Sequence, residues 1–229
     1  MSATAPQGVP LTLYYHPLSS YCHKVLTALY ENDTPFTGVI VNLGDARERA
    51  DLVARWPIGK FPVIHDAGSD RNVAESSIII EYLDRFFRGD TVLIPTDIDD
   101  ALEVRLWDRI FDTYVHTPMQ EIVADRIGGS RGDMAPRRQM IAKAYGMIDT
   151  HLEGRDWINR PGFSLADCAA APSLFYAHVL VPIGAGTPNL KAYFDRLVNR
   201  PSYKRVLEEA RPFFQYFPFV ENLDKRFLP

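Results

Sequence analysis

Two serines and a cysteine stand together in the stretch HPLSSYCHKV, residues 16–25, where a strand is expected to give way to a helix. Hydroxyl and thiol groups at a helix N-terminus can meet an anion that the free backbone N–H groups and the helix dipole also attract. A serine in this place is equally the usual N-cap. The residue types therefore leave open which of Ser19, Ser20 and Cys22 is the chemical group and which only caps the helix.

Other reactive or charged patterns are sparse. The only two cysteines, Cys22 and Cys168, are too few and too far apart for a disulfide framework, and this usage fits a reducing cytoplasm. The six histidines have no ligand spacing such as HExxH, so we predict no metal site. The 25 basic and 29 acidic residues are intermixed without a basic stripe, which argues against nucleic acid as a partner.

The first part of the chain alternates strand and helix signals, which indicates an α/β unit. The 229 residues, 46% of them hydrophobic and 24% charged, are enough for two folded domains. We predict strands at Leu11–Tyr15, Gly38–Leu43 and Phe61–His65, a turn at Gly68–Asn72 into a fourth strand, and helices at Cys22–Tyr30 and Ser76–Phe87.

The rest of the chain is helical in period. We predict helices at Ala101–Val115, ended by Pro118, and at Arg137–Leu152, followed by the apolar stretch Leu165–Ala185, which Ser164 and Asp167 open as a capping box. Charge and prolines interrupt this stretch, so we expect a buried helix and no membrane partner. The aromatic segment Arg211–Phe219 is expected to fold back onto these helices. We place the domains at residues 10–88 and 97–229, joined by a short linker.

Four local patterns, YYHPLSSYCHKV, PIGKFP, AESSIIIEYL and GFSLADCAAAP, follow one another in an order that resembles the cytosolic glutathione transferase family, in its serine-type, delta/zeta/theta-like branch. The resemblance implies a thioredoxin-like, glutathione-binding N-terminal domain and an all-helical C-terminal domain that holds the acceptor-substrate pocket. It also implies a cytoplasmic homodimer that conjugates glutathione to small hydrophobic electrophiles, an activity used in detoxification, with glutathione as co-substrate and no metal.

Within that family the thiol of glutathione must be held as a thiolate, because the thiolate is the nucleophile and a free thiol titrates near ~8.5. A hydroxyl at the start of the first helix can donate a hydrogen bond to the sulfur. Ser19 fits the family register, since it lies six residues before Val25. Ser20 and Cys22 remain the alternatives, and Cys22 would instead form a mixed disulfide with glutathione.

The resemblance also assigns a glutathione-binding set. A cis Phe61–Pro62 bond would turn the Phe61 backbone toward the cysteinyl part of glutathione, and Lys60 would meet the glycyl carboxylate. Ser76 would bind the γ-glutamyl carboxylate at a helix N-terminus, with Glu75 on the amine. The family often has a basic residue after this Glu–Ser pair, where this sequence has Ser77.

For the acceptor pocket we predict Tyr15 of the first strand, then Phe111, Tyr114 and Val115 of the helix Ala101–Val115, and Met119 beyond it, with His116 as a polar group. Two other functions stay open. One is a glutathione-dependent thiol reductase or peroxidase that acts through Cys22 or through glutathione alone. The other is a catalytically silent module that binds ligands or partner proteins.

Overall fold

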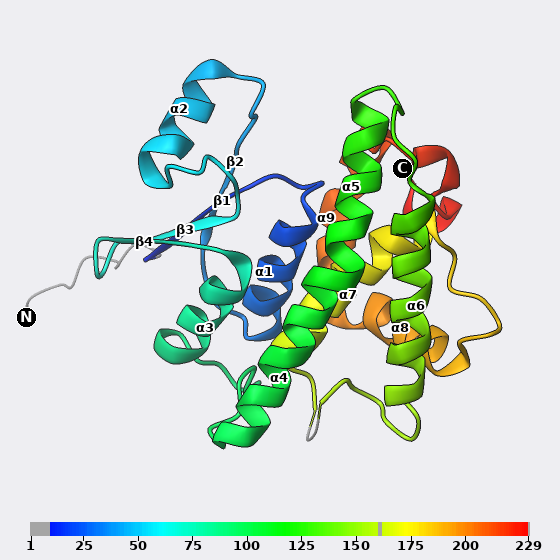
Figure 1. Ribbon diagram of the computed structural model, residues 1–229. Helices are drawn as coiled ribbons and strands as arrows, with labels where there is room; N and C mark the ends of the chain where they lie inside the picture. The colour runs from blue at the N-terminus through cyan, green and yellow to red at the C-terminus, as the bar shows by residue number, and fades with distance from the viewer. Residues whose placement is uncertain (1–9, 160–161, 229) are drawn as a thin grey trace, which may run out of the picture.

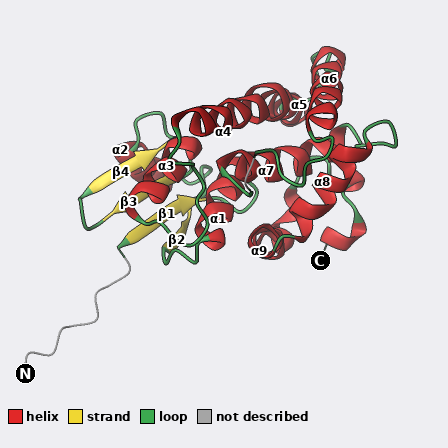
Figure 2. Ribbon diagram, turned by 90° about the horizontal axis from the view of Figure 1, so that it is seen from below, coloured by secondary structure: helices red, strands yellow, loops and turns green. Residues whose placement is uncertain are grey.

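The N-terminal part of the chain forms one four-stranded sheet with helices on both faces. The computed structural model describes residues 10–159 and 162–228. The strands are β1 (Leu11–Tyr15), β2 (Thr37–Ile40), β3 (Val63–Asp66) and β4 (Arg71–Ala74), in the spatial order β2-β1-β3-β4. β1 pairs parallel with β2 and antiparallel with β3, and β3 pairs antiparallel with β4. This mixed sheet confirms the predicted thioredoxin-like α/β fold (Figures 1 and 2).

Alternation along the strands decides which helix covers which face. Leu11 and Leu13 of β1 lie in the same core cluster as α1 (Ser20–Glu31) and α3 (Ser76–Phe86). Tyr14 and Val63 belong instead to a smaller cluster under α2 (Ala46–Arg55). Successive side chains of a strand point to opposite faces, so the sheet separates α1 and α3 from α2.

The helix α2 was not predicted from the sequence. Its sequence ARERADLVAR has only Leu52 buried, so it lacks the apolar stripe from which a helix is recognised. Asp45 caps it, accepting hydrogen bonds from the N–H groups of Arg47 and Glu48 at 2.8 and 3.0 Å. A cap and a polar surface, with one anchoring leucine, are the local features that produce this helix.

The C-terminal part is all-helical, as predicted. It contains α4 (Ile98–Ile110), the π-helical turn η1 (Phe111–His116), α5 (Thr117–Ile127), α6 (Ala135–His151), α7 (Leu165–Leu180), α8 (Pro188–Asn199) and α9 (Pro201–Ala210), then short 3₁₀ turns at Arg211–Tyr216, Val220–Asn222 and Lys225–Phe227. The buried helix α7 begins with the expected capping box of Ser164 and Asp167. The aromatic tail packs as expected, with Phe214, Phe217 and Phe219 buried.

Pro118 does not end a helix, which corrects the sequence prediction. The chain continues from α4 through η1 into α5 as one long rod, visible in Figure 1. The Thr117 N–H reaches back to the Asp112 carbonyl, five residues earlier, and the Thr117 hydroxyl donates to the same oxygen at 2.9 Å. A proline lacks an N–H and crowds the preceding turn, and the wider π-helical turn accommodates it at the start of α5.

The helix α1 joins the two parts, because it packs against α3 on one side and against α7 and α9 on the other. Within residues 10–159 and 162–228, no helix is both long and apolar enough to cross a membrane.

Candidate active site

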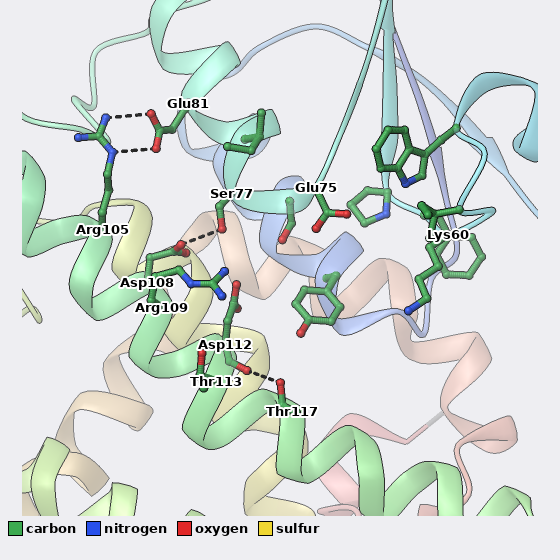
Figure 3. A pocket seen from close by; sticks show the side chains of 17 residues that line it. Lys60, Glu75, Ser77, Glu81, Arg105, Asp108, Arg109, Asp112, Thr113 and Thr117 are labelled. Atoms are coloured by element: carbon green, nitrogen blue, oxygen red, sulfur yellow. Dashed lines mark hydrogen bonds and ion pairs between the residues drawn. The ribbon is translucent and has the colours of Figure 1, made fainter.

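A cleft of ≈ 590 Å³ lies between the N-terminal sheet region and the long rod of α4, η1 and α5 (Figure 3). Tyr21, in the first turn of α1, also lines the cleft. The first wall comes from the segments before β3 and around the start of α3, with Trp56, Ile58, Lys60, Phe61, Pro62, Glu75, Ser76, Ser77, Ile78 and Glu81. The second wall consists of Arg105, Asp108, Arg109, Asp112, Thr113 and Thr117.

The first wall brings together all five residues of the predicted glutathione-binding set. Lys60 is exposed, and the Phe61–Pro62 peptide bond is cis, as expected. Ser76 is the first residue of α3 and is buried, at the end of the helix where the backbone N–H groups have no partner within the helix. Their assignment to glutathione stays a prediction, but the five residues do form one surface.

Glu75 holds a backbone conformation that few residues adopt. Its φ of 67° lies in the left-handed region, and its side chain makes no capping hydrogen bond. Such a conformation costs about 1–3 kcal/mol for a residue other than glycine and is usually kept at functional sites. The side chain is exposed on the cleft wall, where a carboxylate can accept hydrogen bonds from an ammonium group.

Ser19 is the N-cap of α1, and its Oγ accepts a hydrogen bond from the Cys22 N–H at 3.3 Å. It is half-buried and is absent from the cleft lining, although Tyr21 lines the cleft two residues later. Capping uses a lone pair of the hydroxyl oxygen, so the hydroxyl hydrogen remains able to donate. Capping and donation to an anion are therefore compatible at this position.

Ser20 is not the cap, in contrast to what the sequence suggested as its simplest role. It is buried, and its Oγ lies 2.5 Å from His116 Nε2 and accepts a hydrogen bond from Gln120 Nε2 at 2.8 Å. Tyr21 stacks on the His116 ring with the centroids 3.9 Å apart. The first turn of α1 is thus tied to η1 and α5 through Ser20.

Cys22 is wholly buried. Burial raises the pKa of its thiol to about 12, against the weaker opposing effect of a hydrogen bond with Ser19. A thiol in this state is protonated at neutral pH and behaves as a small apolar side chain.

A buried ion cluster lies behind the second wall. Lys24 of α1 is fully buried, with its Nζ 2.5 Å from Asp108 and 2.9 Å from Asp112. It also donates to the hydroxyl of Ser77 at 2.9 Å, and Ser77 donates in turn to Asp108 at 2.7 Å. Lys24 therefore places a cation at Ser77, which follows the Glu75–Ser76 pair at the position where the glutathione transferase family often has a basic residue.

The two carboxylates of this cluster differ. Burial raises the pKa of Asp108, although Lys24 opposes the shift. Burial acts the same way on Asp112, but hydrogen bonds and charge interactions with His116 and Lys24 prevail and lower its pKa to about 2. Asp112 is accordingly the firmly ionised partner of Lys24.

The polar residues of the rod fall into two rows with a spacing of four residues. The anchor row, which contacts Ser20 and Lys24 of α1, consists of Asp108, Asp112, His116 and Gln120. The cleft row, which lines the cleft, consists of Arg105, Arg109, Thr113 and Thr117. Each of Asp108, Asp112 and His116 is followed directly by a member of the cleft row. This shift of one residue turns the anchor row toward α1 and the cleft row toward the cleft.

The predicted acceptor-pocket residues do not lie on this cleft. Phe111, Val115 and Met119 are buried in the hydrophobic core, and His116 is buried in the anchor row. Tyr114 is on the rod but 45% exposed, outside the cleft lining. Tyr15 lines a separate cavity of ≈ 130 Å³ beside α9. The wall that faces the glutathione-binding set is polar instead.

Several lining residues were missed by sequence reasoning. Trp56 and Ile58 precede Lys60 in the PIGKFP region, and their neighbourhood to that motif was a usable signal. Apart from His23, the neighbours of Lys24 in the helix segment CHKVLTAL are apolar or small, which could have marked it as a buried cation. Among the described side chains, no group of three or more His, Cys, Asp or Glu is arranged to hold a metal ion.

The fold and the cleft define a class of protein with a thioredoxin-like domain, an all-helical domain and a polar cleft between them. Family models described as the glutathione S-transferase N-terminal domain and C-terminal domain match residues 13–91 and 129–201. The chain belongs to the glutathione S-transferase family.

Relatives of this chain have several names. It is 26% identical over 180 residues to the glutathione S-transferase-like protein LUC7 of a Fusarium species, covering 76% of this chain and 79% of that protein. It is 27% identical over 214 residues to a stringent starvation protein A homolog of Haemophilus influenzae, covering 93% of this chain and 97% of that protein. A glutathione S-transferase of Methylobacillus flagellatus, solved with glutathione bound, matches with 26% identity and a TM-score of 0.74, over 86% of this chain and 98% of that one.

Proposed function

We propose that the protein is a glutathione transferase of the serine type that acts on small electrophiles. The observation that carries this proposal is the convergence of Lys60, Phe61, Glu75 and Ser76 on one cleft. Their charges complement glutathione, because Lys60 suits the glycyl carboxylate and Glu75 suits the amine. Ser76 and the N-terminus of α3 suit the γ-glutamyl carboxylate. The glutathione-bound relative from Methylobacillus flagellatus supports the choice of ligand.

In the proposed reaction the thiol proton passes to solvent, and the thiolate sulfur attacks the electrophilic carbon. On a chloroarene, a C–S bond forms and the C–Cl bond breaks, so that chloride leaves. The Ser19 hydroxyl donates a hydrogen bond to the thiolate, aided by the N-terminus of α1. A hydrogen bond to a charged group contributes about 1.5–3 kcal/mol, which lowers a thiol pKa by one to two units.

Glutathione binding tests the proposal directly. Millimolar glutathione should raise the thermal midpoint of unfolding, because a ligand bound only by the folded state stabilises that state. Glu75→Gln should weaken binding measured by titration calorimetry, since the partner of the ligand amine loses its charge. Glu103→Gln is the matched control, because Glu103 is exposed on α4 and outside the cleft. No thermal shift and no heat of binding would contradict the proposal.

We also propose that the active form is a homodimer. Four apolar side chains of α3 and α4, each more than half exposed, would be covered by a second copy, namely Ile78, Phe86, Leu102 and Leu106. The bidentate contact of Arg105 with Glu81, at 2.8 Å for both bonds, holds these helices together. Leu106→Glu should yield a monomer in light scattering, whereas Ile127→Glu, on the exposed surface of α5, should not. A monomeric parent protein at micromolar concentration would refute this.

A silent binding module is the second candidate, and two observations favour it. Ser19 is absent from the cleft lining, and a relative that covers almost the whole chain is named a stringent starvation protein A homolog and not a transferase. Glutathione binding without turnover of any chloronitroarene would favour this candidate. The reductase alternative that acts through Cys22 has no such support, because the Cys22 thiol is buried with a raised pKa. Both cysteines are free thiols, which fits the proposed cytoplasmic location.

A further inference from the structure

The cleft row faces the space that an electrophile would occupy opposite the glutathione-binding wall. We propose that this row selects electrophiles that carry a carboxylate, with Arg109 as the residue that binds it. The inference rests on the proposed transferase function, and it replaces the apolar acceptor site that the sequence suggested. It concerns the substrate class of the same cleft.

The spacing of the cleft row makes it a continuous surface. Residues four apart lie on one side of a helix, although each such step turns the row by about 40° in an α-helix of 3.6 residues per turn. The wider π-helical turn η1 takes more residues per turn and so reduces this drift. Arg105, Arg109 and Thr113 therefore stay on the cleft side, with Thr117 following in α5.

The cations of the row differ in their partners. Arg105 is held by Glu81 in a bidentate contact, with both bonds at 2.8 Å. Arg109 forms no ion pair within 4.0 Å with a carboxylate of the described residues, and its side chain extends from α4 into the cleft in Figure 3. Guanidinium groups bind carboxylates bidentately, so Arg109 is the group of this wall that can receive one.

The two aspartates beside Arg109 are already engaged. Asp108 and Asp112 also line the cleft, but both lie within 2.9 Å of Lys24 Nζ of α1. The cleft lining also has two hydroxyl groups that can donate to a ligand, those of Tyr21 and Thr113. Burial, followed by the charge of Asp112, raises the pKa of Tyr21 to about 12, so its hydroxyl stays protonated, and Thr113 is exposed. Arg109 is the cation of this wall that has no ion-pair partner among the described residues, and a guanidinium favours a carboxylate over an apolar ring.

The test uses two electrophiles that differ in one group, a chlorodinitrobenzoate and the matching chlorodinitrobenzamide. Both lose chloride to the glutathione thiolate, and each enzymatic rate is divided by the uncatalysed rate to remove their difference in reactivity. The parent protein should prefer the benzoate. Arg109→Gln should lower kcat/KM for the benzoate by about tenfold and leave the benzamide within about twofold, because one charge-assisted contact is lost.

Arg137→Gln is the charge-matched control, since Arg137 pairs with Glu121 on the surface and lies outside the cleft. It should change neither rate. Equal losses on both substrates, or no loss on either, in Arg109→Gln would overturn the inference. Binding of both compounds without glutathione, measured by quenching of the tryptophan fluorescence, gives a separate reading, because Trp56 lines the cleft. Failure of the parent protein to conjugate either compound would count against the transferase proposal, whereas equal affinity for the two compounds would count against the carboxylate site.

Discussion

The anchor row and the cleft row of the long rod lie one residue apart in register, and their side chains have different partners. Every member of the anchor row contacts Ser20 or Lys24 of α1, and its charges are paired inside the protein. The cleft row opens to the cleft, and its Arg109 has no carboxylate partner among the described residues. A rotation of about 100° per residue around an α-helix thus separates a structural charge from one available to a ligand.

The comparison predicts where charge matters for folding. Lys24→Met leaves Asp108 and Asp112 buried without their cation, and breaking a buried ion pair from one side costs about 3–5 kcal/mol. Denaturant unfolding should show this loss in the free energy of unfolding. Arg109→Gln on the cleft row should change the same quantity by less than about 0.5 kcal/mol. Similar losses in both variants would remove the distinction between the rows.

The buried imidazole of His23, next to the anchor row, should make stability depend on pH. Burial lowers the pKa of His23 to about 4. This imidazole stays neutral in the folded protein above that pH, while the same group in the unfolded chain binds a proton near ~6.5. Its contribution to stability is therefore complete above pH ~6.5 and is lost as pH falls to about 4. The loss is about 3 kcal/mol, from ~1.4 kcal/mol per pKa unit.

Chemical denaturation between neutral pH and pH ~4 measures this loss. His23→Gln keeps a polar side chain that can reach the Pro17 carbonyl, to which His23 Nε2 is 2.6 Å. The variant should lose part of the pH dependence of the free energy of unfolding. An unchanged slope would show that His23 is not the group that titrates.

Ser20 provides the next test, because its role is now structural. Ser20→Ala removes the oxygen that His116 and Gln120 share, and leaves two polar groups without their partner. Such a loss costs about 1–3 kcal/mol, more than a simple cap would explain. Thermal unfolding should report it. Turnover by the folded fraction should change little, and a large loss of turnover at unchanged stability would instead make Ser20 the catalytic hydroxyl.

The sequence predicted the fold well because most elements have a clear apolar period, as in Leu11–Tyr15 and α7. It missed α2, where burial of Leu52 alone leaves no stripe. For the site, two sequence motifs pointed to residues that lie on the cleft. Lys60 and Phe61 belong to PIGKFP, and Glu75 and Ser76 belong to AESSIIIEYL. The second wall was not predicted, because the apolar residues Phe111, Val115 and Met119, which the sequence suggests as pocket lining, fill the hydrophobic core.

The anchor row was missed for a related physical reason. Charged residues on an amphipathic helix are normally solvated, and only the partner helix reveals that Asp108 and Asp112 face a buried lysine. Their contacts with Lys24 join residues more than eighty positions apart in the chain. Periodicity carries no information about such pairs, because it describes one element at a time.

Ser19 and Ser20 are neighbouring residues that also have different partners, as the two rows do. Under the proposed function, Ser19→Ala should lower turnover of a general chloronitroarene by about ten- to a hundredfold at neutral pH, because a charge-assisted hydrogen bond of ~1.5–3 kcal/mol is lost from the thiolate. The loss should shrink as pH rises past the unperturbed thiol pKa near ~8.5, where the thiolate forms without help. Glutathione affinity should hold nearly constant, since the peptide contacts lie on Lys60, Phe61, Glu75 and Ser76.

The cap that Ser19 gives to α1 complicates this reading, because Ser19→Ala also removes the hydrogen bond to the Cys22 N–H and costs about 0.5–2 kcal/mol of stability. Ser19→Asp and Ser19→Thr separate the two roles. Aspartate keeps the cap but repels a thiolate, so it should restore stability without turnover, whereas threonine keeps both a cap and a donor. Turnover rates of the folded variants, measured as a function of pH, then show whether Ser19 contacts the thiolate. Full activity of Ser19→Asp would place the thiolate away from Ser19 and leave the start of α1 with a purely structural role.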